Sequence, residues 1–267
     1  MAVGAGPAPP TIHLVDASPY LFRAFFSVPR TLAQNAVYGF RGFLTRYLKD
    51  HRPTHIAVAF DRHFNQSFRN EYYPDYKAHR EESPKELDAQ VDPCLELVAS
   101  MGVATFIDER HEADDLIATI IHQTRSTGAY YVIVTSDKDL TQLVSARVTW
   151  CDPARDLRFD AAAVEAKFGV RPEQITDFLA LAGDAVDNIP GVRGIGAKTA
   201  AELLRTHGSL DGIYAQLPSI KATLAAKLER DAENARLSKR LATVSIEAPI
   251  AVTVEDLRYR GGAPAGA

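Results

Sequence analysis

Acidic residues stand at the ends of apolar segments in five places along this chain. Asp16 follows the apolar residues 12–15, and Asp61 follows the apolar residues 56–60. Carboxylates at strand ends converge on one crevice when the strands belong to a parallel α/β sheet. We therefore expect acids that are far apart in the sequence to share one site. The full set is Asp16, Asp61, Glu112, Asp114, Asp115, Asp137, Asp139, Asp184 and Asp187.

So many carboxylates in one crevice would repel one another strongly unless cations lay between them. Mg²⁺ and Mn²⁺ are hard cations that prefer oxygen ligands, so they are the natural occupants of such a crevice. Two ions about 3.5–4 Å apart can hydrolyse a phosphodiester, because one activates water and the other stabilises the leaving oxygen. The acidic pattern therefore predicts two-metal chemistry on phosphodiesters.

A single acid at a strand end has a simpler explanation, since it is most often a helix cap or a turn residue. The cluster Glu112, Asp114 and Asp115 is harder to explain in that way, because one acid is enough to cap a helix. Its place in a first helical turn also suits anions. Asp137 and Asp139 flank Lys138, and only one of them can cap the helix that follows.

Composition sets the broad class of the protein. The chain has 267 residues, and its apolar content of 46% supports a folded core. No apolar run approaches the ~20 residues that span a bilayer, so we expect no membrane association. Cys94 and Cys151 lack metal-ligand spacing, which favours free thiols in a reducing cytoplasm.

The chain has a net charge of −4, but its acidic residues are unevenly distributed. Nine of the 34 acids belong to the clusters, and the other 25 stand against 30 bases. If metal ions neutralise the clusters, the remaining surface is mildly basic, which is compatible with phosphate binding.

Short segments rich in valine and isoleucine alternate with helical patterns in the first part of the chain. This alternation predicts an α/β fold with a mostly parallel central sheet. Expected helices cover residues 35–51, 84–100 and 112–126. The expected strands are 11–16, 55–61, 103–107, 130–135 and 147–151. Beyond about residue 160 only helices are expected, at 160–168, 172–182, 197–206, 209–216 and 219–240.

This organisation predicts four parts. Residues 1–10 read as a disordered leader, and residues 11–165 as an α/β core with an insertion at about 62–90. Residues 166–245 read as a helical module, and residues 246–267 as a C-terminal tail. The Gly/Ala-rich end of that tail suggests a stand-alone protein.

The polar, basic and aromatic segment 62–83 interrupts the apolar pattern. Its bases could line a channel for single-stranded phosphates, with tyrosines that stack on nucleic-acid bases. An ordinary solvated loop fits the composition equally well. Arg23 raises a related question, because a charge in an otherwise apolar helix needs a partner, and phosphate is one candidate. The residues of the segment in question are Arg69, Tyr72, Tyr73, Tyr76, Lys77, Arg80 and Lys85.

A glycine-rich turn lies between two apolar helical patterns at residues 188–200. Gly194 and Gly196 allow a close approach of the backbone to a partner, and the next helix begins directly after them. Lys198 and Thr199 add donors, and Gly191 follows a proline. The segment has the features of a helix-hairpin-helix, which grips the DNA backbone without reading its sequence. The alternative is a plain turn between helices.

Together these segments resemble the 5′-nuclease family, which includes the flap endonucleases of phage and bacteria and the N-terminal nuclease domain of bacterial DNA polymerase I. The resemblance extends from about residue 12 to about residue 244. It rests on the motifs Leu-Val-Asp16, Ala-Phe-Asp61, Ser-Phe-Arg69, Tyr76-Lys77-Ala-His-Arg80, Glu112-Ala-Asp114-Asp115, Ser-Asp137-Lys-Asp139-Leu and Gly183-Asp184-Ala-Val-Asp187-Asn-Ile-Pro-Gly.

The resemblance implies a structure-specific 5′-3′ exonuclease and 5′-flap endonuclease of DNA replication and repair, with a PIN-like core and a helical arch at 62–90. Its partner would be DNA with a 5′ flap or 5′ end at a single-strand/duplex junction, and the protein would be a cytoplasmic monomer. The first Mg²⁺ would be held by Asp16, Asp61, Glu112 and Asp114. The second would be held by Asp115, Asp137, Asp139, Asp184 and Asp187.

The resemblance also implies roles for other side chains. Lys77 and Arg80 would be the catalytic basic pair at the base of the arch. Arg23 and Arg69 would contact phosphates, and Tyr76 would stack near the scissile nucleotide. The hairpin would bind the downstream duplex, and also K⁺, through the region of Gly191, Gly194, Gly196, Lys198 and Thr199.

Two other functions remain as alternatives. One is a protein that binds branched DNA without cutting it, but DNA binding alone gains nothing from nine acids that face phosphate. The other is a metal-dependent ribonuclease of the related small fold. The hairpin and the arch-like insertion disfavour this second alternative, because the smaller folds lack both.

Overall fold

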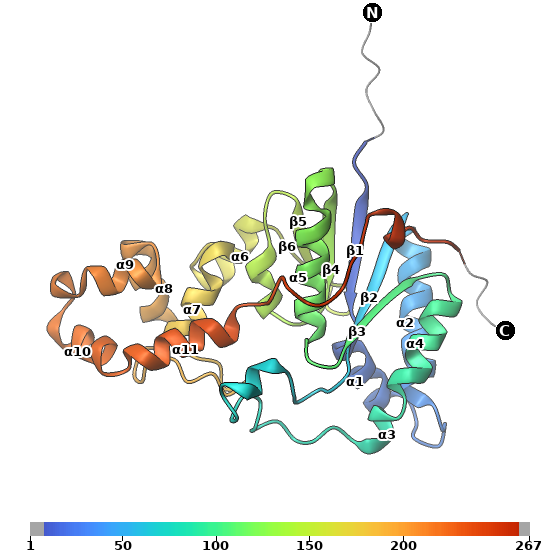
Figure 1. Ribbon diagram of the computed structural model, residues 1–267, viewed down its shortest axis with the longest axis horizontal. Coiled ribbons are helices and arrows are strands. Elements are labelled where there is room, and N and C mark those ends of the chain that lie inside the picture. Colours follow the sequence, from blue (N-terminus) through green and yellow to red (C-terminus); the bar gives the residue numbers. More distant parts are fainter. Residues whose placement is uncertain (1–7, 262–267) are drawn as a thin grey trace, which may run out of the picture.

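The computed structural model describes residues 8–261, so most of the expected leader and the last six residues of the expected tail lie outside the described part. An α/β body and a helical lobe lie at opposite ends of the long axis (Figure 1). No helix within residues 8–261 combines the length and the apolar character that a membrane crossing requires.

The body is built on a six-stranded sheet of order β3-β2-β1-β4-β5-β6. The first five strands are parallel, and β6 pairs with β5 in the antiparallel direction. The sequence did not indicate β6, because it is short and two of its three residues are exposed. The strands are β1 Thr11–Asp16, β2 His55–Asp61, β3 Ala104–Asp108, β4 Tyr130–Val134, β5 Val148–Asp152 and β6 Leu157–Phe159.

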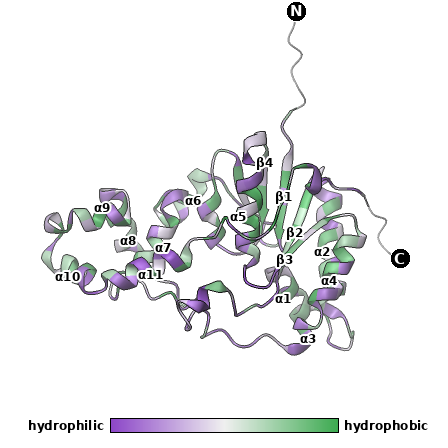
Figure 2. Ribbon diagram, in the orientation of Figure 1, coloured by the Kyte–Doolittle hydropathy of each residue, from purple (hydrophilic) through white to green (hydrophobic). Residues whose placement is uncertain are grey.

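The central strands are apolar because both faces of the sheet are covered. In β2 every residue but the last is buried, and Figure 2 shows the central strands as the most hydrophobic part of the body. One face packs against α1, α2 and α4, and the other against α5 and the helical lobe. The helices of the body are α1 Ser18–Ser27, α2 Asn35–His51, α3 Lys85–Asp88, α4 Val91–Ser100 and α5 Ala113–Thr124.

The lobe contains six α-helices, and its apolar side chains are continuous with the core beneath α5. Two helices expected from the sequence are divided in the structure. The pattern at 84–100 forms α3 and α4, and the pattern at 219–240 forms α10 and α11, which meet at Asp231. The helices are α6 Ala161–Phe168, α7 Ile175–Ala182, α8 Ala197–His207, α9 Leu210–Ala215, α10 Ala222–Arg230 and α11 Ala232–Ala242.

Short 3-10 helices join several of these elements. The first of them is the only regular structure within the segment 62–83, which has little apolar periodicity. They are η1 Phe68–Glu71, η2 Arg125–Thr127, η3 Asp139–Leu143, η4 Pro172–Gln174, η5 Leu217–Ser219 and η6 Glu255–Leu257.

A tight turn connects α7 to the glycine-rich segment and brings two stretches of backbone together. Asp184 and Ile189 form an antiparallel bridge, and Gly183 and Gly191 both have positive φ angles, of 73° and 61°. A Cβ atom on Gly191 would lie 2.7 Å from the Cα atom of Gly183. Only glycine fits there, both because of the φ angle and because of the contact.

We expect Gly191→Ala to lower the melting temperature by about 6–12 °C, the equivalent of roughly 3 kcal/mol, because the new methyl group meets backbone that cannot move aside. Gly42→Ala is the matched control, since a Cβ at that position in α2 meets nothing within 4 Å. Thermal unfolding followed by circular dichroism checks both variants. Equal melting temperatures for the two would show that the turn is not as tight as described.

Candidate metal centre

Five of the nine predicted carboxylates line one cavity of about 290 Å³. Neighbouring strands explain the convergence, because β2, β1 and β4 lie side by side and their carboxyl ends share one edge of the sheet. Strands β1 and β2 contribute their final residues, and the start of α5 and the loop after β4 contribute the rest. The acids are Asp16, Asp61, Glu112, Asp114 and Asp137, and Lys77 and Arg80 line the same cavity.

Hydrogen bonds from nearby elements orient the two strand-end acids. Asp16 accepts bonds from the backbone N–H of Ser18 at 3.1 Å and from the hydroxyl of Thr135 at 2.7 Å. Asp61 accepts the N–H of Ala113 at 2.6 Å, at the start of α5, and the hydroxyl of Ser18. Sequence reasoning did not single out Ser18 or Thr135. The only available signal was their spacing, two residues after Asp16 and two before Asp137.

Burial and mutual repulsion disfavour the charged forms of most of these acids. Burial, together with the charge of Asp61, raises the pKa of Asp16 to about 8. Burial and the charges of Asp137 and Asp16 raise the pKa of Asp114 well above its ordinary value. The pKa values of Asp61 and Asp137 are also raised, chiefly by burial. The cavity therefore favours the binding of positive charge.

Glu112 behaves differently because a lysine is paired with it. Lys77 Nζ lies 2.8 Å from Glu112 Oε2, and the lysine side chain is almost fully buried. Burial alone would raise the pKa of Glu112, but the charges of Lys77 and Arg69 outweigh it and lower the pKa to about 2. Lys77 also has a φ of 58°, a strained value for a residue other than glycine.

A second acidic group lies next to the cavity, where the helical lobe meets the body. The backbone N–H of Asp139 donates to Asp137 at 2.9 Å. Burial and the charges of Asp137, Asp187 and Asp184 raise the pKa of Asp139 well above its ordinary value. Asp187 forms an ion pair with Arg80 and lies 3.9 Å from Lys77 Nζ. Asp139, Asp184 and Asp187 are not among the residues that line the cavity.

Asp115 is fully buried and does not line the cavity either. Its oxygens accept two bonds from the guanidinium of Arg69, both at 2.8 Å, and bonds from the N–H groups of Glu112 and Ser245. Arg69 is only 2% exposed. In this structure Arg69 and Asp115 therefore bind each other away from the cavity, whereas the sequence predicted a phosphate contact and a metal ligand.

Tyr76 and Arg23 have surroundings that the sequence did not indicate. Tyr76 is 4% exposed, and its hydroxyl lies 3.4 Å from Glu112 and 3.3 Å from Asp187, so its ring is not presented to a stacking base. Arg23 lines a separate groove of about 720 Å³ between α1, α2 and the β5–β6 hairpin, with Arg46 and Arg158. The predicted roles of Tyr76 as a stacking residue and of Arg23 as a phosphate contact stay predictions.

The glycine-rich hairpin lies in the helical lobe, and Lys198 and Thr199 stand in the first turn of α8. Two cations of α10 hold carbonyl oxygens of the hairpin. Lys227 Nζ donates to Gly194 at 3.0 Å, and Arg230 donates to Arg193 at 3.0 Å. No local sequence pattern indicated these two contacts, because α8 and α9 separate the hairpin from α10 along the chain.

The donor set of the cavity suits hard divalent ions. Within residues 8–261 no three carboxylate, histidine or cysteine side chains are placed close enough to hold one ion as they stand. Lys77 and Arg80 instead neutralise Glu112 and Asp187. Glu112 Oε1 is nevertheless buried without any hydrogen-bond partner, and an unpaired oxygen of this kind calls for a ligand. An all-oxygen site of repelling carboxylates fits Mg²⁺ or Mn²⁺.

Comparison with known proteins assigns both parts of the chain. Residues 11–169 match the family "5′-3′ exonuclease, N-terminal resolvase-like domain", and residues 170–265 match "5′-3′ exonuclease, C-terminal SAM fold". The chain therefore belongs to the 5′-3′ exonuclease family. This confirms the family, the α/β fold with a helical C-terminal part and the nuclease class that the motifs predicted.

Similar proteins include several bacterial DNA polymerases I. The enzyme of Caldicellulosiruptor bescii is 38% identical over 258 residues, which cover 92% of this chain and 30% of that protein. The enzyme of Bacillus subtilis is 36% identical over 258 residues, which cover 93% of this chain and 29% of that protein. The chain thus spans about a third of the length of these relatives.

Solved structures show the same fold at lower sequence identity. The bacteriophage T5 5′-exonuclease with bound zinc superposes with a TM-score of 0.73 at 24% identity, over 87% of this chain and 89% of that chain. A complex of the T5 flap endonuclease with DNA and metal ions gives 0.73 and 24%, over 87% and 88%. The Rad2 catalytic core with DNA substrate gives 0.60 and 15%, over 96% and 83%.

We expect Asp114→Asn to raise the melting temperature of the metal-free protein by about 2–4 °C, which corresponds to ~1 kcal/mol. The reason is that the substitution removes one of several repelling charges without a change in shape. The same variant should show a smaller rise in melting temperature on addition of Mg²⁺, because a ligand has been lost.

Thermal unfolding in EDTA and in Mg²⁺ measures both effects, and Asp92→Asn serves as a control because Asp92 pairs with Arg62 on the surface. A destabilised Asp114→Asn protein in EDTA would contradict the proposed repulsion.

Proposed function

We propose that the chain is a structure-specific 5′-3′ exonuclease and 5′-flap endonuclease that cuts DNA by a two-metal-ion mechanism in replication and repair. The single observation that carries the proposal is the convergence of five carboxylates with Lys77 and Arg80 in one cavity of a 5′-3′ exonuclease family member. The substrate would be DNA with a 5′ flap or a 5′ end at a single-strand/duplex junction. The T5 flap endonuclease complex with DNA and metal ions supports this choice.

The acids would divide into two groups that hold two Mg²⁺ ions, for which Mn²⁺ can substitute. The bound ions would supply an activated water molecule and neutralise charge at the phosphate. The cavity acids of β1, β2 and α5 would form the first group. The second would consist of the acids after β4 and in the turn after α7. The first group is Asp16, Asp61, Glu112 and Asp114, and the second is Asp137, Asp139, Asp184 and Asp187.

Lys77 and Arg80 would act on the scissile phosphate directly. Both cations are held beside the cavity by carboxylates, Lys77 by Glu112 and Arg80 by Asp187. When a phosphate enters and the acids turn to metal ions, these cations can exchange a carboxylate partner for phosphate oxygens. A fixed ammonium or guanidinium stabilises the charge that develops in the transition state, because it needs no reorganisation.

The helix-hairpin-helix would hold the duplex beyond the cut. The backbone N–H groups near Gly194 and Gly196 and the N-terminus of α8 form an anion site, to which Lys198 and Thr199 add donors. K⁺ would bind other carbonyl oxygens of this turn, since Lys227 and Arg230 already hold those of Gly194 and Arg193. We further propose a cytoplasmic monomer, which is consistent with the free thiols of Cys94 and Cys151.

A labelled duplex with one 5′ flap tests the proposed activity. We expect cleavage close to the junction in Mg²⁺, none in EDTA, and products with 5′-phosphate and 3′-hydroxyl ends. Asp137→Ala should fold and bind the flap but fail to cut it. Binding without cleavage by the native protein would support a branched-DNA-binding protein, and equal cleavage of an RNA flap would support a ribonuclease.

Lys77→Ala should slow the single-turnover cleavage rate by about 10²–10³-fold, while its affinity for the flap changes much less. The reason is that a buried ammonium beside the acids contributes mainly when charge develops on the phosphate. Rapid-quench cleavage and fluorescence anisotropy measure rate and affinity separately, and Lys49→Ala on the exposed face of α2 is the control. An unchanged rate would remove Lys77 from the mechanism.

A further inference from the structure

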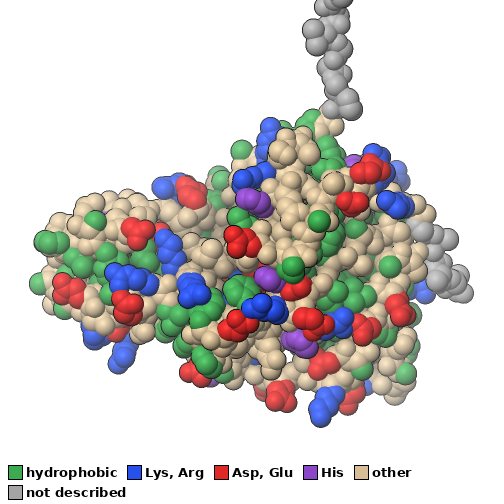
Figure 3. Space-filling model, in the orientation of Figure 1, with side chains coloured by type: hydrophobic (Ala, Val, Ile, Leu, Met, Phe, Trp, Pro, Cys, Tyr) green, Lys and Arg blue, Asp and Glu red, His purple; other side chains and the backbone are tan. Residues whose placement is uncertain are grey.

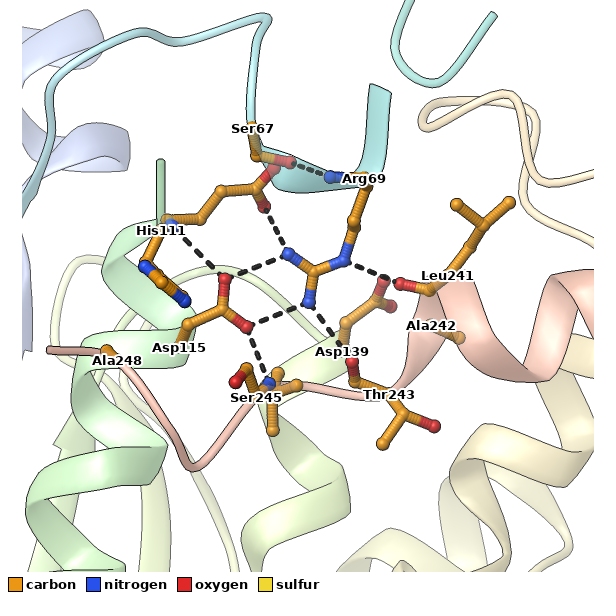
Figure 4. Close-up of polar contacts among 12 residues, drawn as sticks. Ser67, Arg69, His111, Asp115, Asp139, Leu241, Ala242, Thr243, Ser245 and Ala248 are labelled. Carbon is orange, nitrogen blue, oxygen red and sulfur yellow. Dashed lines mark hydrogen bonds and ion pairs between the residues drawn. The ribbon is translucent and has the colours of Figure 1, made fainter. Parts of the chain in front are cut away.

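The buried pair of Arg69 and Asp115 joins three parts of the molecule that are distant in sequence. Arg69 belongs to η1, within the expected arch region 62–90, and Asp115 lies in the first turn of α5. The third part is the end of α11 together with residues 243–245, which follow that helix. Figure 4 shows the guanidinium at the centre of these contacts. The two side chains are respectively 2% and 0% exposed.

Each donor group of Arg69 has a partner. Its Nε donates to the carbonyl of Leu241 at 2.9 Å, and one terminal nitrogen donates to the carbonyl of Thr243 at 3.1 Å. Both terminal nitrogens also bind Asp115 at 2.8 Å. The carbonyls lie at the C-terminus of α11, where a helix leaves its last acceptors unsatisfied and where a cation is favoured. Arg69 therefore fixes the end of the helical lobe to the start of α5.

Asp115 connects Arg69 to the segment that carries the acids of the cavity. It accepts the backbone N–H of Glu112 at 3.1 Å and the N–H of Ser245 at 2.6 Å. Glu112 and Asp114 line the cavity, whereas Asp115 does not and binds Arg69 and Ser245 instead. Asp114 and Asp115 are adjacent in sequence but have different surroundings, because successive positions of a helical turn point in different directions.

We propose that Arg69 and Asp115 are positioning residues, which set the placement of Glu112 and Asp114 according to the position of the helical lobe. They would act neither as a phosphate contact nor as a metal ligand. This inference rests on the proposed function, because Glu112 and Asp114 are among the acids proposed there to bind metal ions. Partners of metal ligands that act through hydrogen bonds typically alter metal affinity or activity by 10–100-fold when removed.

The test compares Arg69→Met, Asp115→Asn and the double variant with the native protein. Mn²⁺ binding followed by electron paramagnetic resonance gives the number of ions and their affinity. Flap cleavage gives kcat, KM and the Mg²⁺ concentration at half-maximal rate. Arg69→Lys keeps the positive charge but removes the guanidinium, which binds Asp115 through two nitrogens at once. Arg110→Met is the matched control, since Arg110 forms an exposed ion pair with Glu71 at 2.6 Å nearby.

We expect Arg69→Met and Asp115→Asn to bind as many Mn²⁺ ions as the native protein, with affinity weakened about 10-fold. Their kcat should fall about 10–100-fold while KM for the flap stays within about threefold, with a raised Mg²⁺ requirement. The double variant should be no worse than the more impaired single variant, because the pair acts as one unit. Arg69→Lys should be intermediate, and Arg110→Met unchanged.

Other results would overturn the proposal. Loss of one ion by Asp115→Asn, as expected for Asp114→Asn, would make Asp115 a ligand. A raised KM with unchanged kcat in Arg69→Met would make Arg69 a phosphate contact. Multiplicative losses in the double variant would show two independent roles. Circular dichroism well below the melting temperature verifies that each variant is folded, and a purely structural role would leave the Mn²⁺ affinity of the folded protein unchanged.

Failure of the proposed function is distinguishable from failure of this inference. If the native protein does not cleave any flap, the Mn²⁺ affinities and the double-variant comparison still report whether the pair places the acids of α5.

Discussion

Repulsion among carboxylates at one edge of the sheet is the constraint on which the rest of the structure depends. Parallel strands bring Asp16, Asp61 and Asp137 to the same edge, and burial adds to the cost of their charges. The fold tolerates this arrangement because basic groups from other segments offset part of it. A site of this kind loses stability in the free protein and regains it when cations bind.

The compensating bases come from the segment 62–83, and this explains why that segment is ordered despite its polar sequence. Lys77 and Arg80 pair with Glu112 and Asp187, and Asn188 donates to the carbonyl of Asp75 at 2.7 Å. The segment therefore contacts Glu112 in the cavity and the turn that follows α7. Figure 3 shows acidic and basic side chains interspersed over one face of the molecule, without a single-sign surface.

Coupling between the two parts of the chain is a further consequence of the same packing. The core beneath α5 continues into the helical lobe, so the glycine-rich hairpin and the acids of α5 belong to one packed unit. The guanidinium of Arg69 lies where these parts meet and satisfies the carbonyls at the end of α11. A displacement of the lobe would therefore shift the start of α5.

Local sequence patterns predicted the five parallel strands, their order along the chain and the carboxylates that follow them, because apolar periodicity and strand-end chemistry are local. They also indicated the glycine-rich turn. They predicted neither β6 nor the division of two helical patterns into α3 and α4 and into α10 and α11. Only the tertiary structure decided that Asp114 lines the cavity while Asp115 does not, and that Arg69 and Tyr76 are buried. The physical reason is separation along the chain. The partners of Arg69 lie 46 and 172 residues away, and no local pattern records which side chain will meet which carbonyl after folding.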